Sequence, residues 1–246
     1  MTRVASATDN ARMRLPLRAV SLDLDNTLWD TPPVLARAEA RLRAWLLTHC
    51  PRLAARFATA DLARLRQQLA AEQPARAHDL TWLRTEVLLR AAAASGYPAE
   101  VAHAAFEVFI AARNQIEPYP EVRTALARLA ARVPLYALSN GNACVERVGL
   151  GRYFRGAIDA AEAGAAKPDP RIFARLIAMA GARPAALLHV GDDAAADVGG
   201  ARAAGLATAW MNRGGETWPV ADPGPDHEVH DLAELATLVE RLTGGI

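Results

Sequence analysis

Hydrophobic residues in the first half of the chain recur with the spacing of a helix face. Between Thr31 and about Glu117, apolar side chains return every three or four positions, which places them on one side of an α-helix. Thr31 can cap the first helix, and Pro32 suits its first turn. Further helices are predicted at 59–73, 79–95 and 99–113. Because no strand pattern lies between them, residues 31–117 are predicted to form a helical bundle of their own.

After Pro118 the pattern changes to short apolar runs that alternate with amphipathic stretches. Strands are predicted at 133–139, 156–159, 185–190 and 206–210, with a weak strand near Glu228 and Val229. Helices are predicted at 121–131, 142–149, 170–181, 194–204 and 231–243. Strands that alternate with helices are typical of a parallel sheet whose faces are covered by helices.

An earlier apolar run, residues 19–24, supplies the first strand of this sheet. The sequence therefore predicts a doubly wound, Rossmann-like α/β core made of residues 15–30 and 118–246. The helical bundle, residues 31–117, is inserted after the first strand. Residues 1–14 are predicted to be a flexible tail.

The chain has 246 residues with 28 basic and 27 acidic side chains, and its formal net charge is +1. Because no strong field of one sign results, nucleic acid and membranes are not expected as partners, and a small substrate is. Cys50 and Cys144 lack the spacing of a disulfide framework or a zinc site and fit the reducing cytoplasm. Neither a signal peptide nor a membrane span is predicted. The sequence leaves the oligomeric state open, and we expect a monomer or a weak homodimer.

Polar residues follow the predicted strands on the side where parallel sheets bind ligands. Asp23 and Asp25 follow the first strand, and Ser139 and Asn140 follow the second. The ligand crevice of an open parallel sheet lies beyond the carboxyl ends of its strands. An ordinary turn that caps the next helix would also explain the two acids, and Ser139 can be a helix cap.

Three more acids and a lysine are predicted to lie at the same edge. Asp192 and Asp193 follow the fourth strand, Asp197 comes one helical turn later, and Lys167 lies in the preceding loop. Taken singly, helix caps and a solvated lysine explain them. Taken together, the carboxylates would repel one another, so a cation is expected among them. Oxygen ligands of this kind suit Mg²⁺.

Four short stretches resemble the four motifs of the haloacid dehalogenase superfamily. They are DLDNT at 23–27, Ser139 after an apolar strand, Lys167-Pro168, and GDDAAAD at 191–197, and they occur in the family's order. The resemblance covers nearly the whole chain from about residue 18. It implies a hydrolase whose α/β core carries the reaction and whose inserted helices, residues 31–117, form a C1 cap over the site.

For a phosphatase of this superfamily, the resemblance implies a role for each motif residue. Asp23 would be the nucleophile that attacks phosphorus and becomes an aspartyl phosphate. Asp25 would protonate the leaving oxygen and then activate water. Ser139 and Asn140, with nearby backbone N–H groups, would bind the phosphoryl oxygens, and Lys167 would neutralise the nucleophile and the transferring group.

The resemblance also implies Mg²⁺ as the cofactor. Its ligands would be the Asp23 carboxylate, the backbone carbonyl of Asp25, and Asp192. Either Asp193 or Asp197 would complete the site, directly or through water. The residues alone do not decide between these two acids.

The stretches ALSNGNA, GLGRYF and LLHVGDDAAADVGGARAAGLATAWMNR are similar to a bacterial branch of small C1-capped phosphatases. That branch includes enzymes that act on FMN and on 5-amino-6-(5-phospho-D-ribitylamino)uracil, an intermediate of riboflavin synthesis. A small phosphorylated metabolite is therefore the expected substrate. In the predicted cap, His78, Trp82, Arg84 and Arg113 are the candidates for substrate contact, although packing or a surface ion pair is the simpler explanation of each.

Two other functions remain open at this point. A 2-haloacid dehalogenase of the same superfamily would release halide without Mg²⁺, and Asp25 argues against it because that branch lacks the second acid. A non-catalytic binding protein on the same fold agrees less well with four complete motifs.

Overall fold

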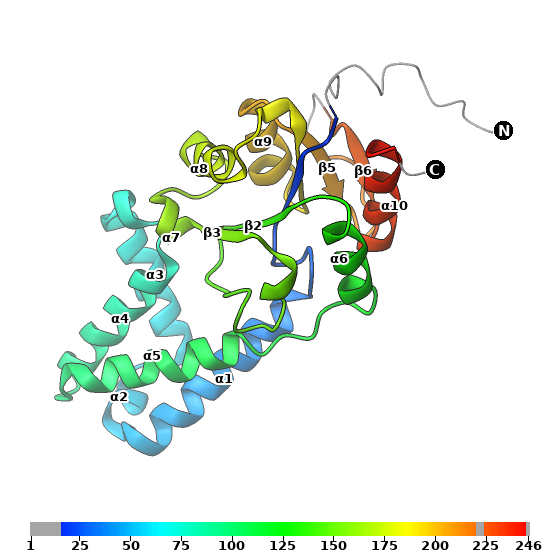
Figure 1. Cartoon of the computed structure of the whole chain (residues 1–246). Helices are drawn as coiled ribbons and strands as arrows, with labels where there is room; N and C mark the ends of the chain where they lie inside the picture. Colours follow the sequence, from blue (N-terminus) through cyan, green and yellow to red (C-terminus); the bar gives the residue numbers. More distant parts are fainter. Residues whose placement is uncertain (1–15, 220–223, 245–246) are drawn as a thin grey trace.

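The computed structural model describes residues 16–219 and 224–244, so the tail predicted at residues 1–14 lies outside the described residues. Six parallel strands form one sheet in the order β3-β2-β1-β4-β5-β6 (Figure 1). Their bounds are β1 (Ala19–Leu22), β2 (Leu135–Ser139), β3 (Gly156–Asp159), β4 (Leu187–Gly191), β5 (Ala207–Met211) and β6 (His227–Val229). The order runs outward in both directions from β1, which confirms the doubly wound α/β fold.

Helices fill the insert and connect the strands. The insert contains α1 (Thr31–His49), α2 (Pro51–Arg56), α3 (Thr59–Glu72), the 3₁₀ turn η1 (Pro74–Arg76), α4 (Leu80–Ala94) and α5 (Ala99–Arg113). The rest contains α6 (Val122–Ala130), η2 (Gly151–Tyr153), α7 (Ala160–Ala163), α8 (Pro170–Ala180), η3 (Pro184–Ala186), the π-helical turn η4 (Ala194–Gly199), α9 (Gly200–Ala203) and α10 (Leu232–Leu242). In Figure 1, α6 and α10 cover one face of the sheet, and α8 and α9 cover the other.

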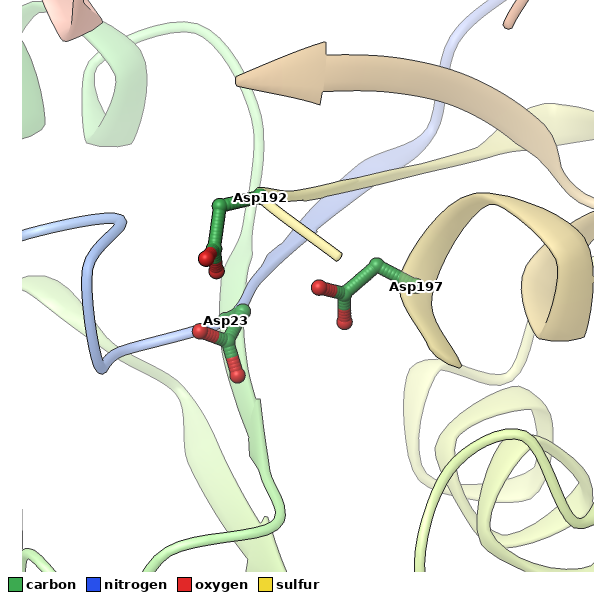
Figure 2. A group of neighbouring side chains, drawn as sticks. All are labelled: Asp23, Asp192 and Asp197. Carbon is green, nitrogen blue, oxygen red and sulfur yellow. The ribbon is translucent and has the colours of Figure 1, made fainter. Parts of the chain in front are cut away.

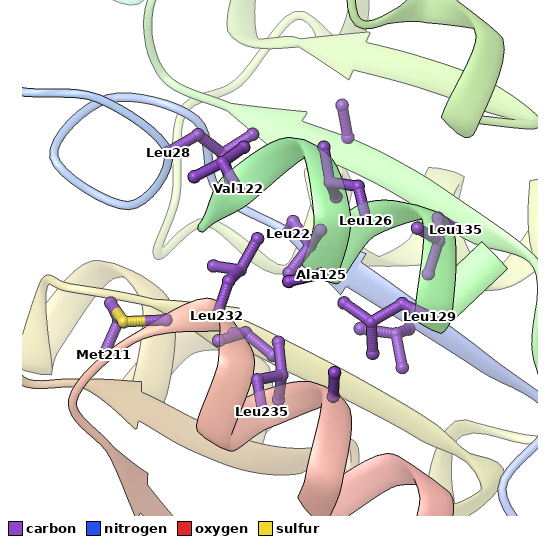
Figure 3. Close-up of a cluster of buried hydrophobic side chains, with 14 of the residues drawn as sticks. Leu22, Leu28, Val122, Ala125, Leu126, Leu129, Leu135, Met211, Leu232 and Leu235 are labelled. Atoms are coloured by element: carbon purple, nitrogen blue, oxygen red, sulfur yellow. The ribbon is translucent and has the colours of Figure 1, made fainter. Parts of the chain in front are cut away.

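Each face of the sheet has its own hydrophobic layer. On the first face, α6 turns the stripe Val122, Leu126 and Leu129 toward the strands, and α10 adds Leu232 and Leu235 (Figure 3). These five side chains are at most 1% exposed, and burial of each contributes about 1.5–3 kcal/mol relative to an exposed side chain. This packing fixes the strand ends that carry the polar motifs.

The insert buries a separate hydrophobic cluster, which includes Leu46, Leu88 and Phe109. Its two connections to the sheet lie side by side, because Trp29 forms an antiparallel bridge with Pro118. The insert is therefore a helical body, and the chain enters and leaves it through two neighbouring segments (Figure 1). Its division from the core at residues 31–117 stays a prediction.

One predicted helix is wrong, because residues 142–149 form a loop that closes only a single turn. The Val148 N–H donates to the Cys144 carbonyl at 3.0 Å. The Cys144 N–H donates to the side chain of Asn114 at 2.8 Å, and Gly149 has a left-handed φ of 75°. A short stretch tied to another segment at its start and turned by a glycine at its end lacks the length to propagate a helix.

Smaller differences concern how elements begin. Thr31 is the first residue of α1, and Asp30 occupies the capping position without a side-chain capping bond. The helix predicted at 194–204 divides into η4 and α9, and the short α7 was not predicted. Among the described residues, no helix has the length and apolar character needed to cross a membrane.

Candidate active site

Three acidic side chains point toward one another at the carboxyl edge of the sheet (Figure 2). Asp23 follows β1, Asp192 follows β4, and Asp197 lies in η4. One carboxylate oxygen of each lies within 4.8 Å of the others. The acids converge because β1 and β4 are neighbours, with Leu22 opposite Val190 at their ends.

A glycine allows Asp197 to reach this group. A Cβ atom on Gly191 would lie 2.2 Å from the carboxyl carbon of Asp197, which is far inside van der Waals contact. Asp193 serves a different purpose, because its side chain accepts hydrogen bonds from the N–H groups of Ala195 and Ala196 at 2.8 and 2.7 Å. Of the two acids that the sequence left open, the structure thus brings Asp197 to the group and uses Asp193 to cap η4.

Lys167 joins two of the acids. Its buried ammonium donates to Oδ1 of Asp23 and to Oδ1 of Asp197, both at 2.6 Å, and to the Leu138 carbonyl at 2.7 Å. All three donor positions of the ammonium are therefore used. The lysine holds the two carboxylates in place and leaves one oxygen of each for other partners.

Asn140 and Ser139 build the wall beside Lys167. The Asn140 side chain accepts from the Lys167 N–H at 2.7 Å and donates to the Lys167 carbonyl at 3.0 Å, so it fixes the backbone of the lysine loop. Ser139 Oγ accepts from the Gly141 N–H at 2.9 Å. Its hydroxyl can still donate to a ligand, because accepting this bond does not use its hydrogen.

His189 belongs to the same network and was not predicted from the sequence. This buried side chain lies in the middle of β4, with Nε2 at 3.1 Å from Oδ1 of Asp197 and Nδ1 at 2.7 Å from Oγ of Ser21. Burial lowers the pKa of His189 despite the opposing effect of Asp197. The neutral imidazole donates from Nε2 to Asp197 and accepts from Ser21, which orients the acid. The sequence feature that could have identified this residue is a histidine inside an otherwise apolar strand.

Burial disfavours the charged form of Asp23, Asp192 and Asp197, and charged neighbours add to this effect or oppose it. Burial raises the pKa of Asp23, with Lys167 opposing the shift and Asp197 adding to it. Burial raises the pKa of Asp192 to about 6, and Asp197 adds to this shift as well. Burial also opposes the charge of Asp197, but Lys167 and His189 outweigh it and lower the pKa of that carboxyl.

The site is under-neutralised and fits a divalent cation. Three carboxylates face a single ammonium, so the fully ionised cluster of Asp23, Asp192, Asp197 and Lys167 has two negative charges in excess. The donors are all carboxylate oxygens, which hard divalent ions prefer. The Asp192 carboxylate accepts a long bond from the Thr27 hydroxyl at 3.5 Å and is not bonded by Lys167, so it is well placed to bind such an ion.

Asp25 lines a cavity together with Asp23 and Lys167, and its carboxylate is held by four contacts. Oδ1 accepts from Nε1 of Trp29 and from the hydroxyl of Thr31, both at 2.9 Å. Nη2 of Arg113 donates to Oδ1 at 2.7 Å and to Oδ2 at 2.5 Å. A Cβ on Gly141 would lie 2.4 Å from Oδ2, so a glycine is needed beside this carboxylate. Asp25 is thereby linked to both ends of the insert, through α1 and α5.

Two adjoining cavities open at this edge of the sheet. A cavity of about 280 Å³ is lined by Asp23, Asp25, Ser139, Lys167 and Asp192, among others. A second cavity, of about 220 Å³, shares Asp25 with the first and extends into the insert. A larger cavity of about 770 Å³ is lined by residues of β6 and α10 and contains none of the motif residues.

The four candidate contacts in the insert fall into two groups. Arg84 and Arg113 line the 220 Å³ cavity. Trp82 stacks with Arg76, whose guanidinium carbon lies 4.1 Å from the ring centroid. His78 is half-buried and precedes Asp79, the residue that caps α4. Neither Trp82 nor His78 lines either of the two cavities.

The described residues form a six-stranded parallel sheet with an inserted helical body, and acids and a lysine gather at the carboxyl edge of the sheet. This is the architecture of haloacid dehalogenase-like hydrolases. The chain belongs to this family, whose sequence pattern matches residues 17–205. It is therefore an enzyme and a hydrolase, and its relatives include phosphatases.

Three proteins show which members of the family the chain resembles. The chain is 34% identical to the 5-amino-6-(5-phospho-D-ribitylamino)uracil phosphatase YigB of Escherichia coli over 91% of this chain and 96% of that protein. It is 34% identical to a phosphoserine phosphatase of Thermus thermophilus over 62% of this chain and 63% of that protein. Among solved structures, a 2-haloacid dehalogenase from Pseudomonas syringae matches with a TM-score of 0.86 and 38% identity, over 92% of this chain and 99% of that one.

Proposed function

We propose that this chain is a Mg²⁺-dependent phosphomonoesterase that forms an aspartyl phosphate on Asp23. The observation that carries the proposal is the pair Asp23 and Asp25, which line one cavity together with Lys167. A phosphate ester needs a nucleophile, a proton for the leaving oxygen and positive charge around the phosphoryl group. Asp23 supplies the nucleophile, Asp25 supplies the proton, and Lys167 supplies part of the positive charge.

The reaction has two displacement steps. In the first, an oxygen of Asp23 attacks phosphorus, the bond to the leaving oxygen breaks, and Asp25 gives that oxygen its proton. In the second, the Asp25 carboxylate takes a proton from water, the water oxygen attacks phosphorus, and the bond to Asp23 breaks. Phosphate leaves, and both side chains return to their starting states. The Ser139 hydroxyl donates to a phosphoryl oxygen throughout, and the nearby positive charge of Lys167 stabilises the negative phosphoryl group.

Mg²⁺ would be bound by Asp23 and Asp192, with Asp197 completing the acidic group and the Asp25 carbonyl as a further oxygen ligand. When bound, the ion neutralises negative charge on the nucleophile and on the phosphoryl group. Asp197 already accepts from Lys167, His189 and the Asp193 N–H. Its main task in this proposal is to orient Lys167, and Asp192 carries more of the ion binding.

Mg²⁺ is expected to stabilise the protein more at pH 8 than at pH 5. Because the pKa of Asp192 is raised to about 6, the folded state keeps a proton that the unfolded chain loses near pH 4. Stability from this proton is complete below about pH 4 and is lost as the pH rises through about 6. A cation competes with the proton, so its gain is largest where the proton has left. We expect a rise in Tm of about 5–10 °C at pH 8 with Mg²⁺ at 100 times the Kd measured at that pH, and about half of that rise at pH 5 with the same Mg²⁺ concentration.

Thermal unfolding with and without Mg²⁺ measures this effect. Asp192→Asn should remove most of the rise in Tm at pH 8, whereas Asp193→Asn should keep it, because asparagine preserves the cap of η4. An equal rise at both pH values, or an undiminished rise in Asp192→Asn, would contradict the proposed metal site.

For the substrate, we propose a small phosphorylated metabolite of the type of 5-amino-6-(5-phospho-D-ribitylamino)uracil. Support comes from a relative of nearly the same length that is named for this substrate. The two adjoining cavities add support, because one can hold the phosphoryl group while the other holds the end of the leaving group.

A panel of phosphate esters tests this proposal. With Mg²⁺, kcat/KM for the phosphorylated ribitylaminouracil should exceed that for p-nitrophenyl phosphate, O-phosphoserine and sugar phosphates by about 10- to 100-fold, because each additional hydrogen bond to the leaving group contributes about 0.5–1.5 kcal/mol. FMN belongs in the same panel. Equal turnover of all these esters would rule out the riboflavin-related substrate while leaving the phosphatase activity standing.

Dehalogenation is the second candidate function. It is favoured by the high structural similarity to the 2-haloacid dehalogenase of Pseudomonas syringae. Against it stands Asp25, because halide leaves without a proton whereas an alkoxide does not. The excess negative charge at Asp23, Asp192 and Asp197 also favours a metal-dependent reaction.

A further inference from the structure

The 220 Å³ cavity beside the proposed phosphoryl site is lined by three arginines of the insert. Arg66 lies on α3, Arg84 on α4 and Arg113 at the end of α5. This cavity shares Asp25, and therefore the position of the leaving oxygen, with the cavity that contains the nucleophile. A leaving group bound at Asp25 would extend toward the three guanidinium groups.

These arginines have too few acidic partners. Arg66 and Arg84 share the single carboxylate of Glu39, with distances of 3.6 and 2.8 Å. Arg113 pairs with Asp25, but among the described residues its Nη1 atom has no hydrogen-bond partner, although the residue is only 2% exposed. When Asp25 carries the proton for the leaving oxygen, three guanidinium groups face one carboxylate. A partly buried excess of positive charge and an unused buried donor indicate a missing acceptor.

Arg84 gives the cavity a flat wall. Its guanidinium carbon lies 3.4 Å from the ring centroid of Phe109, and its side chain is 10% exposed. Burial lowers the pKa of Arg84 to about 10, Glu39 opposes this shift, and Arg66 adds to it. The charge of Arg84 is thus only partly balanced inside the protein. A planar acceptor would gain hydrogen bonds from the guanidinium groups and would stack on the flat guanidinium of Arg84.

We infer that this cavity binds a planar group with oxygen acceptors, which forms the end of the leaving group farthest from the phosphate. The inference rests on the proposed phosphatase function. Arginine has only donors, so the bound group must present acceptors, as a carboxylate or the dioxo edge of a pyrimidine ring does. The volume of 220 Å³ is that of about seven water molecules. One six-membered ring or a short carboxylate chain fits such a space.

Binding to matched pairs of ligands tests this inference without turnover. The protein carries Asp23→Asn, so that esters are bound and not consumed, and Kd is measured by calorimetry. The first pair is phosphorylated ribitylaminouracil and ribitol 5-phosphate, which lacks the ring. The second pair is 3-phosphoglycerate and glycerol 3-phosphate, which lacks the carboxylate. In at least one pair, the acceptor-bearing member should bind about 10- to 100-fold more tightly, and the pair that shows this identifies ring or carboxylate.

Adding Arg84→Met should reduce that preference to within about threefold, and adding Arg66→Met should reduce it as well. Arg90→Met is the matched control, because Arg90 lies on the same helix with a side chain that is 52% exposed, and it should keep the preference. Equal Kd values within both pairs, or a preference that survives Arg84→Met and Arg66→Met, would overturn the inference. Because Kd does not depend on turnover, a clear preference without phosphate release from the parent enzyme would uphold this cavity and reject the proposed phosphatase function.

Discussion

Asp23→Asn is expected to reduce Mg²⁺-dependent phosphate release by about 10⁴-fold or more, because the amide that replaces the carboxylate is a poor nucleophile. The substitution keeps the shape of the side chain. Lys167 retains Asp197 and the Leu138 carbonyl as partners, and the new amide oxygen can still accept from it. Burial already disfavours the charge of Asp23, as its raised pKa indicates. We therefore expect the fold to be kept and the Tm not to fall.

Phosphate release and thermal unfolding of the same preparations measure this prediction. Asp169→Asn is the matched control, since Asp169 caps α8 next to the lysine loop and asparagine preserves a cap. The control should keep nearly all activity. Activity at the level of the parent enzyme in Asp23→Asn would show that another group attacks phosphorus.

Asp25→Asn is expected to lower kcat for alkyl phosphates by about 10²- to 10⁴-fold, the range for loss of a general acid and base. The side-chain oxygen of asparagine can still accept from Trp29 and Thr31. Arg113 loses its charged partner, so the variant should also lose about 1–3 kcal/mol of stability. The activity must therefore be measured well below the Tm of the variant.

p-Nitrophenyl phosphate separates the two roles of Asp25. Nitrophenolate is stable without a proton, so its release should survive the loss of the acid. Hydrolysis of the aspartyl phosphate should remain slow, because no base activates the water. We expect a burst of nitrophenolate equal to the amount of enzyme, followed by slow turnover. An equal loss for both kinds of ester, with no burst, would argue that Asp25 serves only to hold the structure.

The residues at the edge of the sheet could be predicted because topology brings them together. Asp23, Ser139 and Asp192 each follow a strand, and neighbouring parallel strands end at the same edge. Their convergence requires only the strand order and not the details of packing. For the same reason, the doubly wound fold followed from the alternation of strands and helices.

Contacts between distant segments could not be predicted. The bond between Arg113 and Asp25 joins positions 88 residues apart, and the contact depends on how the insert lies against the sheet. His189 reaches Asp197 through the π-helical turn η4, a geometry that hydrophobic periodicity does not encode. The loop at 142–149 has the composition of a helix but is held by Asn114 from the insert. In each instance tertiary contacts decide what the local pattern leaves open.

The choice between Asp193 and Asp197 shows the same limit within one motif. Both acids belong to GDDAAAD, and both can bind a metal by chemistry alone. The structure separates them because Asp193 bonds the N–H groups at the start of η4, whereas Asp197 passes over Gly191 to reach Lys167. Gly191 was visible in the sequence, but the space that it leaves for the Asp197 carboxylate matters only because η4 follows it.

We propose that this site hydrolyses phosphate esters with Mg²⁺ and does not release halide from 2-haloacids. The two reactions are separated by measuring phosphate release from the phosphorylated ribitylaminouracil and chloride release from 2-chloropropionate on one preparation, each with Mg²⁺ and with EDTA. We predict phosphate release that EDTA abolishes and Mg²⁺ restores, with no chloride release under either condition. Chloride release that persists in EDTA, without Mg²⁺-dependent phosphate release, would contradict the claim.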